Sequence, residues 1–534
     1  MCRLCDEGRP QDHAASRDDP PHASRREFLK TTTAAAVAGA GLLTTSQAEA
    51  ARPDDVGPVD SGRPGRRYVI RGGHVMTMDP QLGDFAQADV LVDGKTIVDV
   101  APNLDVRGAG VIDARGRIVM PGFVDTHHHL FETVLRSFLA NGILLPDGTP
   151  PSVINYFQYI LLRFAPVYRP EDVYINEVFG SLSQLDAGVT TTHDISQIHH
   201  SPEHSDAAIQ GLVDSGRRAA FGYFESAGAV PGNQYPNDAR RIRRQWFSSE
   251  DQLVTMIMGG EIYLPGYEAA WNIGRELGLQ VAAHIVSGFG MRPTFDLIAD
   301  GKGGDSGTLG FGPDNLFIHM TGMSDDAWQK VANVGAAVSL AVPIEMVMRH
   351  GMPPILKTQS LGIEPSLSVD VECTLTADFF TQMRAAMGLQ RALVNQAILD
   401  FGFAQDPPNY WPAPPVGTPD LLTTQDVLRY ATVNGARDLR LDHKIGSITR
   451  GKEADIVLLD AEAINVAPLN NVPGAVVSVM DRSNVETVIV AGKVRKWKGK
   501  LLDANLAKLR RDLETSRDRV FDAAGIEQDL FRRF

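Results

Sequence analysis

Three consecutive histidines at the end of an apolar run are the residues of this sequence best suited to chemistry. Residues 118–124 are apolar, and His127-His128-His129 follow two residues later. Side chains alternate between the two faces of an extended strand, so His127 and His129 point the same way and His128 points the opposite way. Neutral imidazole is the commonest protein ligand for metal ions. The spacing predicts that His127 and His129 chelate one divalent cation; the alternative is a polar histidine cluster in a loop.

Three more ionisable residues stand at the ends of apolar runs farther along the chain. They are His284, His319 and Asp370, and the runs before them have the composition of buried strands. A single residue of this kind is more often a hydrogen-bonded structural group. Several such groups at the same end of parallel strands meet at one place, however, because these strand ends share one rim. The sequence therefore predicts one constellation with the histidine pair.

The elements that must position these residues are eight strand-like runs, which alternate with helix-like stretches in the pattern of βα units. The runs comprise residues 118–124, 189–194, 219–224, 253–258, 279–285, 316–320, 336–340 and 366–371. They predict an α/β fold with a closed (β/α)8, TIM-like barrel over residues 118–440. The active site of such a barrel lies at the C-terminal ends of its strands.

Short strands separated by turns occur at both ends of the barrel region. Residues 67–117 and 441–500 both show this pattern, and neither set is complete alone. We expect them to assemble one small β-sandwich domain from the two ends of the chain. Residues 501–534 are charged and helical in pattern, and we expect a surface helix that packs on this sandwich.

The first 50 residues have the pattern of an export signal. Basic Arg25-Arg26 precede a short apolar run, and residues 48–50 supply an A-x-A cleavage site. The paired arginines resemble the twin-arginine type of signal, which implies the twin-arginine export machinery as a partner and a periplasmic or extracellular location. Residues 51–66 are rich in Pro, Gly and Asp and are expected to form a flexible linker.

Composition and cysteine content narrow the functional class. The chain has 534 residues, of which 43% are hydrophobic and 22% charged, as in a soluble globular protein. Its net charge of -14 argues against a nucleic-acid partner, which requires a basic surface. Cys2 and Cys5 precede the predicted cleavage site, so Cys373 alone would remain and no internal disulfide could form. We expect a small-molecule substrate, and a homo-oligomer is compatible with the sequence.

The residues around the histidines also carry a resemblance to a known family. Residues 121–129, Pro-Gly-Phe-Val-Asp-Thr-His-His-His, resemble the PGxxDxHxH signature of the metal-dependent amidohydrolase superfamily, and in particular the branch of cytosine deaminase, guanine deaminase and the triazine hydrolases. The resemblance covers residues 67–500. It implies the following roles: metal ligands His127, His129 and His284; fourth ligand and proton acceptor Asp370; substrate contact His319. This set suits one Zn or Fe(II) ion and leaves a position for water.

Two questions stay open: the number of metal ions, and which carboxylate carries the proton. The run that ends at Glu261 has no Lys that could become a bridging ligand, which favours one metal ion, although Glu261 keeps a second ion open. In the deaminase branch a proton-carrying Glu follows the strand-five His by three residues, and here that position is Ser287. Glu372 shares the strand parity of Asp370, so it is one candidate replacement, and a salt-bridged carboxylate is the alternative. Glu225 is a weaker candidate.

Other histidines and aromatic residues receive simpler interpretations. His193 stands near the end of the second strand-like run and could reach the substrate, whereas the nearby His199, His200 and His204 are expected to be supporting or surface residues. Three further histidines, His74, His350 and His443, are interpreted as structural. The aromatic residues Tyr156, Phe157 and Tyr159 are expected in the core rather than in a lid.

The constellation predicts a hydrolase in which metal-activated water attacks a carbon bonded to nitrogen in a non-peptide substrate. Deamination of an amino-substituted N-heterocycle and opening of a cyclic amide are both open. Displacement of a halide from an activated ring is a further variant, because it needs less proton delivery to the leaving group. The alternative from another class is an exported, non-catalytic metal- or ligand-binding protein of the same fold. The water-activating carboxylate Asp370 argues against it.

Overall fold

The computed structural model describes residues 60–148, 154–226 and 232–531. The predicted export signal (residues 1–50), with Cys2 and Cys5, and residues 51–59 of the predicted linker lie outside these ranges. Every helix within the described part of the chain is too short or too polar to cross a membrane.

The predicted barrel is confirmed: eight parallel strands pair in sequence order. They are β6 (Phe123–His128), β7 (Val189–Ser196), β8 (Arg218–Tyr223), β9 (Val254–Gly259), β10 (Val281–Val286), β11 (Asn315–Thr321), β12 (Ala337–Leu340) and β13 (Ser366–Leu367). Every residue of β6, β7 and β8 is buried, because helices cover the outer face of the barrel while side chains fill its interior.

The barrel closes at the residues with the strongest chemical signature. Just beyond β13, the backbone N–H of Asp370 donates to the carbonyl of His127 at 2.9 Å, and the N–H of His129 donates to the carbonyl of Asp370 at 2.9 Å. The last strand is therefore joined to the first by the residues of the predicted site.

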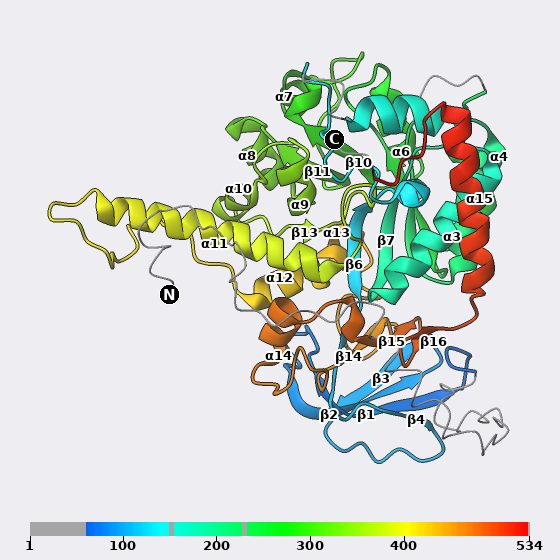
Figure 1. The fold of residues 1–534 in the computed structure, drawn as a ribbon, viewed down its shortest axis with the longest axis vertical. Helices are drawn as coiled ribbons and strands as arrows, with labels where there is room; N and C mark the ends of the chain where they lie inside the picture. Colours follow the sequence, from blue (N-terminus) through cyan, green and yellow to red (C-terminus); the bar gives the residue numbers. More distant parts are fainter. Residues whose placement is uncertain (1–59, 149–153, 227–231, 532–534) are drawn as a thin grey trace, which may run out of the picture. The chain divides into compact units, whose positions relative to one another are not determined.

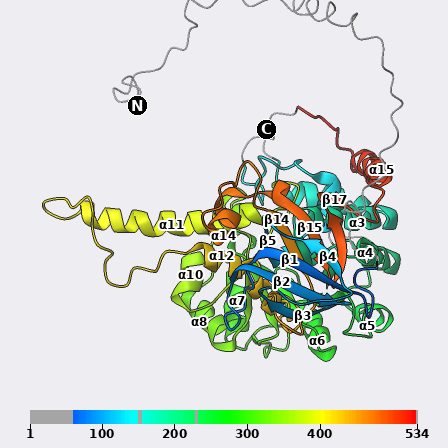
Figure 2. The same ribbon diagram turned by 90° about the horizontal axis from the view of Figure 1, so that it is seen from below.

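Helices surround the strands (Figure 1). They are α3 (Pro170–Asp186), α4 (Pro202–Ser215), α5 (Ala239–Trp246), α6 (Tyr267–Glu276), α7 (Arg292–Ala299), α8 (Asp325–Val334), α9 (Val342–Val347), α10 (Ile355–Ser360), α11 (Phe379–Phe403), α12 (Thr424–Tyr430) and α13 (Val433–Asp438). Short 3-10 and π segments, η2 (Leu130–Leu135), η3 (Phe157–Phe164), η4 (Ala165–Val167) and η5 (Ser287–Phe289), lie in the loops after β6 and β10. The far end of α11 extends away from the barrel in both ribbon views (Figures 1 and 2).

A second sheet is built from both ends of the chain, as expected (Figure 2). Its strands are β1 (Arg67–Val75), β2 (Phe85–Asp93), β3 (Thr96–Ala101), β4 (Gly110–Asp113), β5 (Arg117–Pro121), β14 (Ile456–Asp460), β15 (Val485–Val490), β16 (Lys493–Trp497) and β17 (Lys500–Leu501). The two ends meet where β5 pairs antiparallel with β14. Short segments α14 (Val472–Gly474), η6 (Ala475–Val479) and η7 (Arg482–Asn484) lie between β14 and β15.

The run of residues 118–124 is two strands rather than the one predicted. Strand β5 belongs to the end sheet, and the barrel begins with β6 at Phe123. The break falls at Gly122, where a Cβ atom would lie 2.2 Å from the side chain of Thr190. Both strands are buried and apolar, so the hydrophobic pattern does not change at Gly122 and does not indicate where one strand ends and the next begins.

The C-terminal helix does not pack on the end sheet as predicted. Helix α15 (Leu506–Ala524) lies along α3 of the barrel (Figure 1). Ser516 Oγ donates to Asp172 Oδ1 at 2.7 Å, Arg519 pairs with the same carboxylate, and the ring of Phe521 lies 4.9 Å from that of Phe164. An amphipathic helix shows which of its faces is apolar, but it does not show which surface will receive that face.

A buried ion-pair group joins the end sheet to the barrel. Arg218, the first residue of β8, is 1% exposed; its Nε donates to Asp455 Oδ2 at 2.8 Å and its Nη2 to Glu453 Oε2 at 2.6 Å. Asp455 also accepts from the backbone N–H of Ala491 at 2.7 Å. The end sheet is thus fastened near the N-terminal ends of the barrel strands, opposite the predicted site.

Candidate active site

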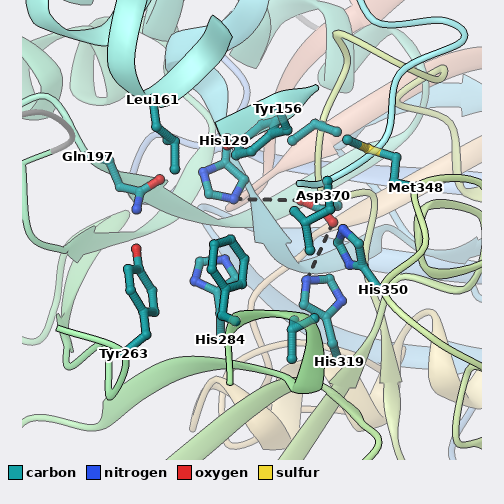
Figure 3. A pocket seen from close by; sticks show the side chains of 14 residues that line it. His129, Tyr156, Leu161, Gln197, Tyr263, His284, His319, Met348, His350 and Asp370 are labelled. Carbon is teal, nitrogen blue, oxygen red and sulfur yellow. Dashed lines mark ion pairs between the residues drawn. The ribbon is translucent and has the colours of Figure 1, made fainter. Parts of the chain in front are cut away.

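The predicted metal-binding side chains converge at the C-terminal end of the barrel. His127 Nε2 lies 3.0 Å from the Nε2 atoms of both His129 and His284. Asp370 Oδ1 lies 3.5 Å from His127 Nε2. It also lies 3.6 Å from His129 Nε2, and this pair is drawn in Figure 3. His128 points the other way, toward Asp125, as the strand parity predicts. Donor atoms around one zinc ion are on the order of 3 Å apart, so this spacing fits a single cation.

The protonation of these imidazoles also fits a metal ion. Glu261 Oε1 lies 2.5 Å from His284 Nδ1, and a carboxylate oxygen can only accept, so Nδ1 donates this bond and Nε2 is the ring nitrogen that faces His127. Burial, reinforced by the neighbouring histidines, lowers the pKa of His127 and of His129 well below the usual value, which keeps both rings neutral. Nitrogen lone pairs this close repel one another unless a cation lies between them.

Glu261 is occupied by His284 and lies outside both groups of described side chains that could hold a metal. These groups are His127 with His129 and His284, and His127 with His319 and Asp370. The two share His127, so the geometry fits one centre and gives no support to a second ion held by Glu261.

Asp370 is held in a special backbone conformation. Its φ of +73° lies in the left-handed region, which non-glycine residues seldom adopt and which is enriched at functional sites. The two backbone hydrogen bonds to His127 and His129 and a bond from the N–H of Val369 to Asp125 Oδ1 (3.1 Å) maintain it. Burial, together with nearby Glu132 and other carboxylates, raises the pKa of Asp370 well above its usual value.

His319 faces the same space from the end of β11. Its Nε2 lies 3.5 Å from Asp370 Oδ2, and its Nδ1 lies 3.1 Å from Glu345 Oε1, which also accepts from the N–H of Ala341 at 2.9 Å. Burial raises the pKa of Glu345 to about 8 and lowers that of His319 well below its usual value. Glu345 therefore fixes the ring so that Nε2 points toward Asp370.

Glu372 does not face the site. Its carboxylate pairs with Arg136 at 2.7 Å and 3.0 Å, and it is absent from the described residues that line the pocket. The parity argument failed because it assumes an extended chain, whereas the left-handed φ of Asp370 turns the backbone between the two acidic residues. Glu372 is thus the salt-bridged carboxylate of the alternative interpretation.

His193 is also displaced from its expected position. It is fully buried inside the barrel, its Nδ1 lies 3.0 Å from the carbonyl oxygen of Thr126, and it does not line the pocket. The three histidines that follow it support the surrounding loops through hydrogen bonds, as expected. They are His199, His200 and His204.

A pocket lies over the convergent side chains (Figure 3). It is lined by His129, Leu144, Tyr156, Leu161, Gln197, Tyr263, His284, Val286, Phe289, His319, Met348, His350, Asp370 and Val371. The loops after the strands contribute most of the lining residues that the sequence did not reveal.

Two interpretations from the sequence change here. His350 is not merely structural, since its ring lies 4.7 Å from that of His319 and faces the pocket. Tyr156 is both buried and part of the pocket wall, and its hydroxyl donates to Glu132 at 2.6 Å. Glu225, a weaker candidate, lies behind the wall with its Oε1 3.1 Å from the hydroxyl of Tyr263. No local pattern marked His350, because its loop carries no strand or helix periodicity.

Solved structures with this fold include two zinc-containing proteins. An adenosine deaminase from Xanthomonas campestris, solved with bound Zn, superposes with a TM-score of 0.69 at 23% identity, over 86% of this chain and 99% of that one. Atrazine chlorohydrolase from Arthrobacter aurescens, solved in complex with zinc, superposes with a TM-score of 0.65 at 19% identity, over 84% and 100% of the two chains. These similarities show the fold.

Sequence relatives cover the same region. The 5'-deoxyadenosine deaminase of Methanosarcina mazei is 25% identical over 437 residues, which is 80% of this chain and 92% of the relative. The 5-methylthioadenosine/S-adenosylhomocysteine deaminase of Symbiobacterium thermophilum is 24% identical over 449 residues, or 80% and 93%. The profile of the Amidohydrolase family matches residues 118–495, from β5 through the whole barrel and into β16 of the end sheet. This chain therefore belongs to the amidohydrolase family.

Proposed function

We propose that this protein is a metal-dependent hydrolase that removes the amino group from an amino-substituted N-heterocycle. The observation that carries the proposal is the cluster of three imidazoles and one carboxylate at the floor of the pocket. The deaminase activities of its relatives support the choice of a carbon–nitrogen bond.

Each residue of the cluster has a role in this proposal. One Zn or Fe(II) ion would be held by His127, His129, His284 and Asp370. Its Lewis acidity would lower the pKa of water, so that the water could lose a proton near neutral pH and become a nucleophile toward carbon. Asp370 accepts a proton from the attacking water and returns it to the departing amine. His319, oriented by Glu345, hydrogen-bonds to the substrate ring beside Asp370.

Halide displacement is a second candidate, and one observation favours it. Asp370 is the only carboxylate among the described residues that line the pocket, and Ser287 stands where the deaminase branch has a proton-carrying Glu. A halide leaving group needs no proton, so this site would suit it.

The deciding test is product analysis on the purified, Zn-loaded full-length chain. Ammonia released from aminopurine nucleosides and lost after chelation would support deamination. Chloride released from a chloro-substituted triazine without ammonia from any amino-heterocycle would favour displacement instead. A protein that binds no metal at stoichiometric level would contradict both functions.

The Glu261–His284 pair supports a further expectation. We expect Glu261→Gln to weaken metal binding by about 10–100-fold, because a carboxylate that accepts from the distal nitrogen of a metal-binding His orients the ring and raises its basicity. Competition with a fluorescent chelator measures the affinity. The control is Glu276→Gln, since Glu276 is surface-exposed and pairs with Arg240. Equal affinities of the two variants would show that Glu261 does not position His284.

We also propose that the protein is exported by the twin-arginine pathway. The support is the sequence of residues 1–50, with Arg25-Arg26 before a short apolar run. The double substitution Arg25→Lys and Arg26→Lys is expected to retain the protein in the cytoplasm, as shown by cell fractionation and immunoblotting. The double substitution Arg510→Lys and Arg511→Lys in α15 is the control. Unchanged export of the first variant would exclude this pathway.

A further inference from the structure

We propose, resting on the deaminase function above, that the substrate is an uncharged amino-N-heterocycle with an uncharged, largely apolar substituent. Anionic and zwitterionic relatives of the same heterocycle are excluded by the pocket. The two sequence relatives differ in the charge of the substrates that their names give. One is named for the neutral nucleoside 5'-deoxyadenosine, and the other for both neutral methylthioadenosine and the amino-acid conjugate S-adenosylhomocysteine.

The first observation is the absence of a cation in the wall. Among the described residues that line the pocket there is no Lys or Arg, and Asp370 is the only carboxylic acid. Residues 149–153 and 227–231, the two gaps in the described barrel, contain no Lys or Arg in their sequence. A carboxylate or phosphate is normally recognised by Arg or Lys in a charge-assisted bond, and the described residues that line this pocket include no such group.

The second observation concerns two arginines: Arg349, which is adjacent in the chain to pocket residues, and Arg136, which pairs with Glu372 next to the pocket residue Val371. Arg349 lies between Met348 and His350 but pairs with Asp147 and is largely exposed. Arg136 is bound by Glu372, with an Nη2–Oε2 distance of 2.7 Å. Each of these guanidinium groups already has a carboxylate partner, so neither offers its charge to a substrate.

The third observation is the character of the groups behind the wall. Glu132, Glu225 and Glu345 are buried there, and each has one carboxylate oxygen without a hydrogen-bond partner in the described structure. Acidic groups cannot compensate an anion that loses its hydration on entering the pocket. A substituent with a negative charge would therefore enter without a partner.

The remaining wall fits a flat, neutral ring system. The rings of Tyr263 and Phe289 stack with centroids 5.1 Å apart, and Leu161 and Met348 add apolar surface (Figure 3). Both ring nitrogens of buried His350 lack a partner among the described residues. Neutral imidazole offers one donor and one acceptor, which matches the edge of an uncharged amino-heterocycle.

The test compares substrates that share adenine and differ in charge. Ammonia release by the Zn-loaded full-length chain is measured with 5'-deoxyadenosine and 5'-methylthioadenosine, and with S-adenosylhomocysteine and adenosine monophosphate. We expect kcat/KM to be at least about 100-fold higher for the two uncharged nucleosides, since a site without partners for a charged group rejects it strongly. Comparable values for S-adenosylhomocysteine would overturn this inference and leave the deaminase function intact. Ammonia from none of the four would overturn both.

Adjacent leucines offer a matched pair of variants. Leu161 lines the pocket and is 7% exposed, whereas Leu162 is 51% exposed. Leu161→Arg is expected to lower the ratio of kcat/KM for uncharged substrates to kcat/KM for charged substrates by about 10-fold or more, because it places a cation in the pocket wall. Leu162→Arg should leave the preference unchanged. An equal effect of the two variants would contradict the role of pocket charge, and the wild-type comparison decides the inference if Leu161→Arg fails to fold.

Discussion

Asp370→Asn is expected to lower kcat by on the order of 10³-fold while the barrel remains folded. The amide has nearly the same shape as the carboxylate, but it cannot accept a proton from water and is a poorer metal ligand. The backbone bonds that close the barrel at Asp370 involve only main-chain atoms, so the substitution preserves them. Steady-state ammonia release measures kcat, and circular dichroism together with bound metal reports the fold and the site.

Asp378→Asn is the matched control. Asp378 is also buried, but its side chain caps α11 by accepting from the N–H of Thr381 at 2.8 Å. Asn caps helices about as well as Asp, so activity and stability should both be retained. If Asp370→Asn kept more than about a tenth of the wild-type kcat, Asp370 would not be the general base, because such groups contribute about 10²–10⁴-fold.

Arg218→Ala is expected to lower the free energy of unfolding by about 3–5 kcal/mol. The guanidinium is the only cation among the described residues that bonds to the buried carboxylate of Asp455, and it also neutralises Glu453. Removing it leaves the buried carboxylate of Asp455 without a cationic partner among the described residues, while Glu453 keeps only Lys95, whose Nζ lies 3.1 Å from Glu453 Oε1. Urea denaturation, followed by circular dichroism, measures the loss as a lower midpoint.

The control for this prediction is a salt bridge at the surface. Arg240 pairs with Glu276 at 2.5 Å, with side chains 38% and 52% exposed, and Arg240→Ala should cost at most about 1 kcal/mol because water screens the pair. If Arg218→Ala shifted the midpoint no more than Arg240→Ala, the group would not hold the end sheet to the barrel.

Much of the barrel and of its cluster of convergent histidines and Asp370 was predictable from local patterns. Apolar runs that alternate with amphipathic stretches define strands and helices, because burial on both faces of a parallel strand demands apolar side chains. His284, His319 and Asp370 end such runs, and parallel strands bring their ends to one rim. These residues could therefore be grouped without coordinates.

The partners of those residues could not be predicted in this way. Glu261 and Glu345 each bond to a site histidine, whereas Glu372, which has the favourable parity, bonds to Arg136. Parity holds only while the chain stays extended, and the left-handed φ of Asp370 breaks it. Which carboxylate meets which imidazole depends on loops from different strands.

The strands and helices of the barrel, the convergent histidines with Asp370, and the rim at which these side chains meet could be inferred along the chain, because they follow from hydrophobic periodicity and strand direction. Three features could not be inferred in this way: Gly122 divides two strands, α15 packs on α3, and His350 faces the pocket. Each of these depends on contacts between residues far apart in the chain. Local periodicity carries no information about such contacts, since it records only whether a side chain is buried and not what buries it.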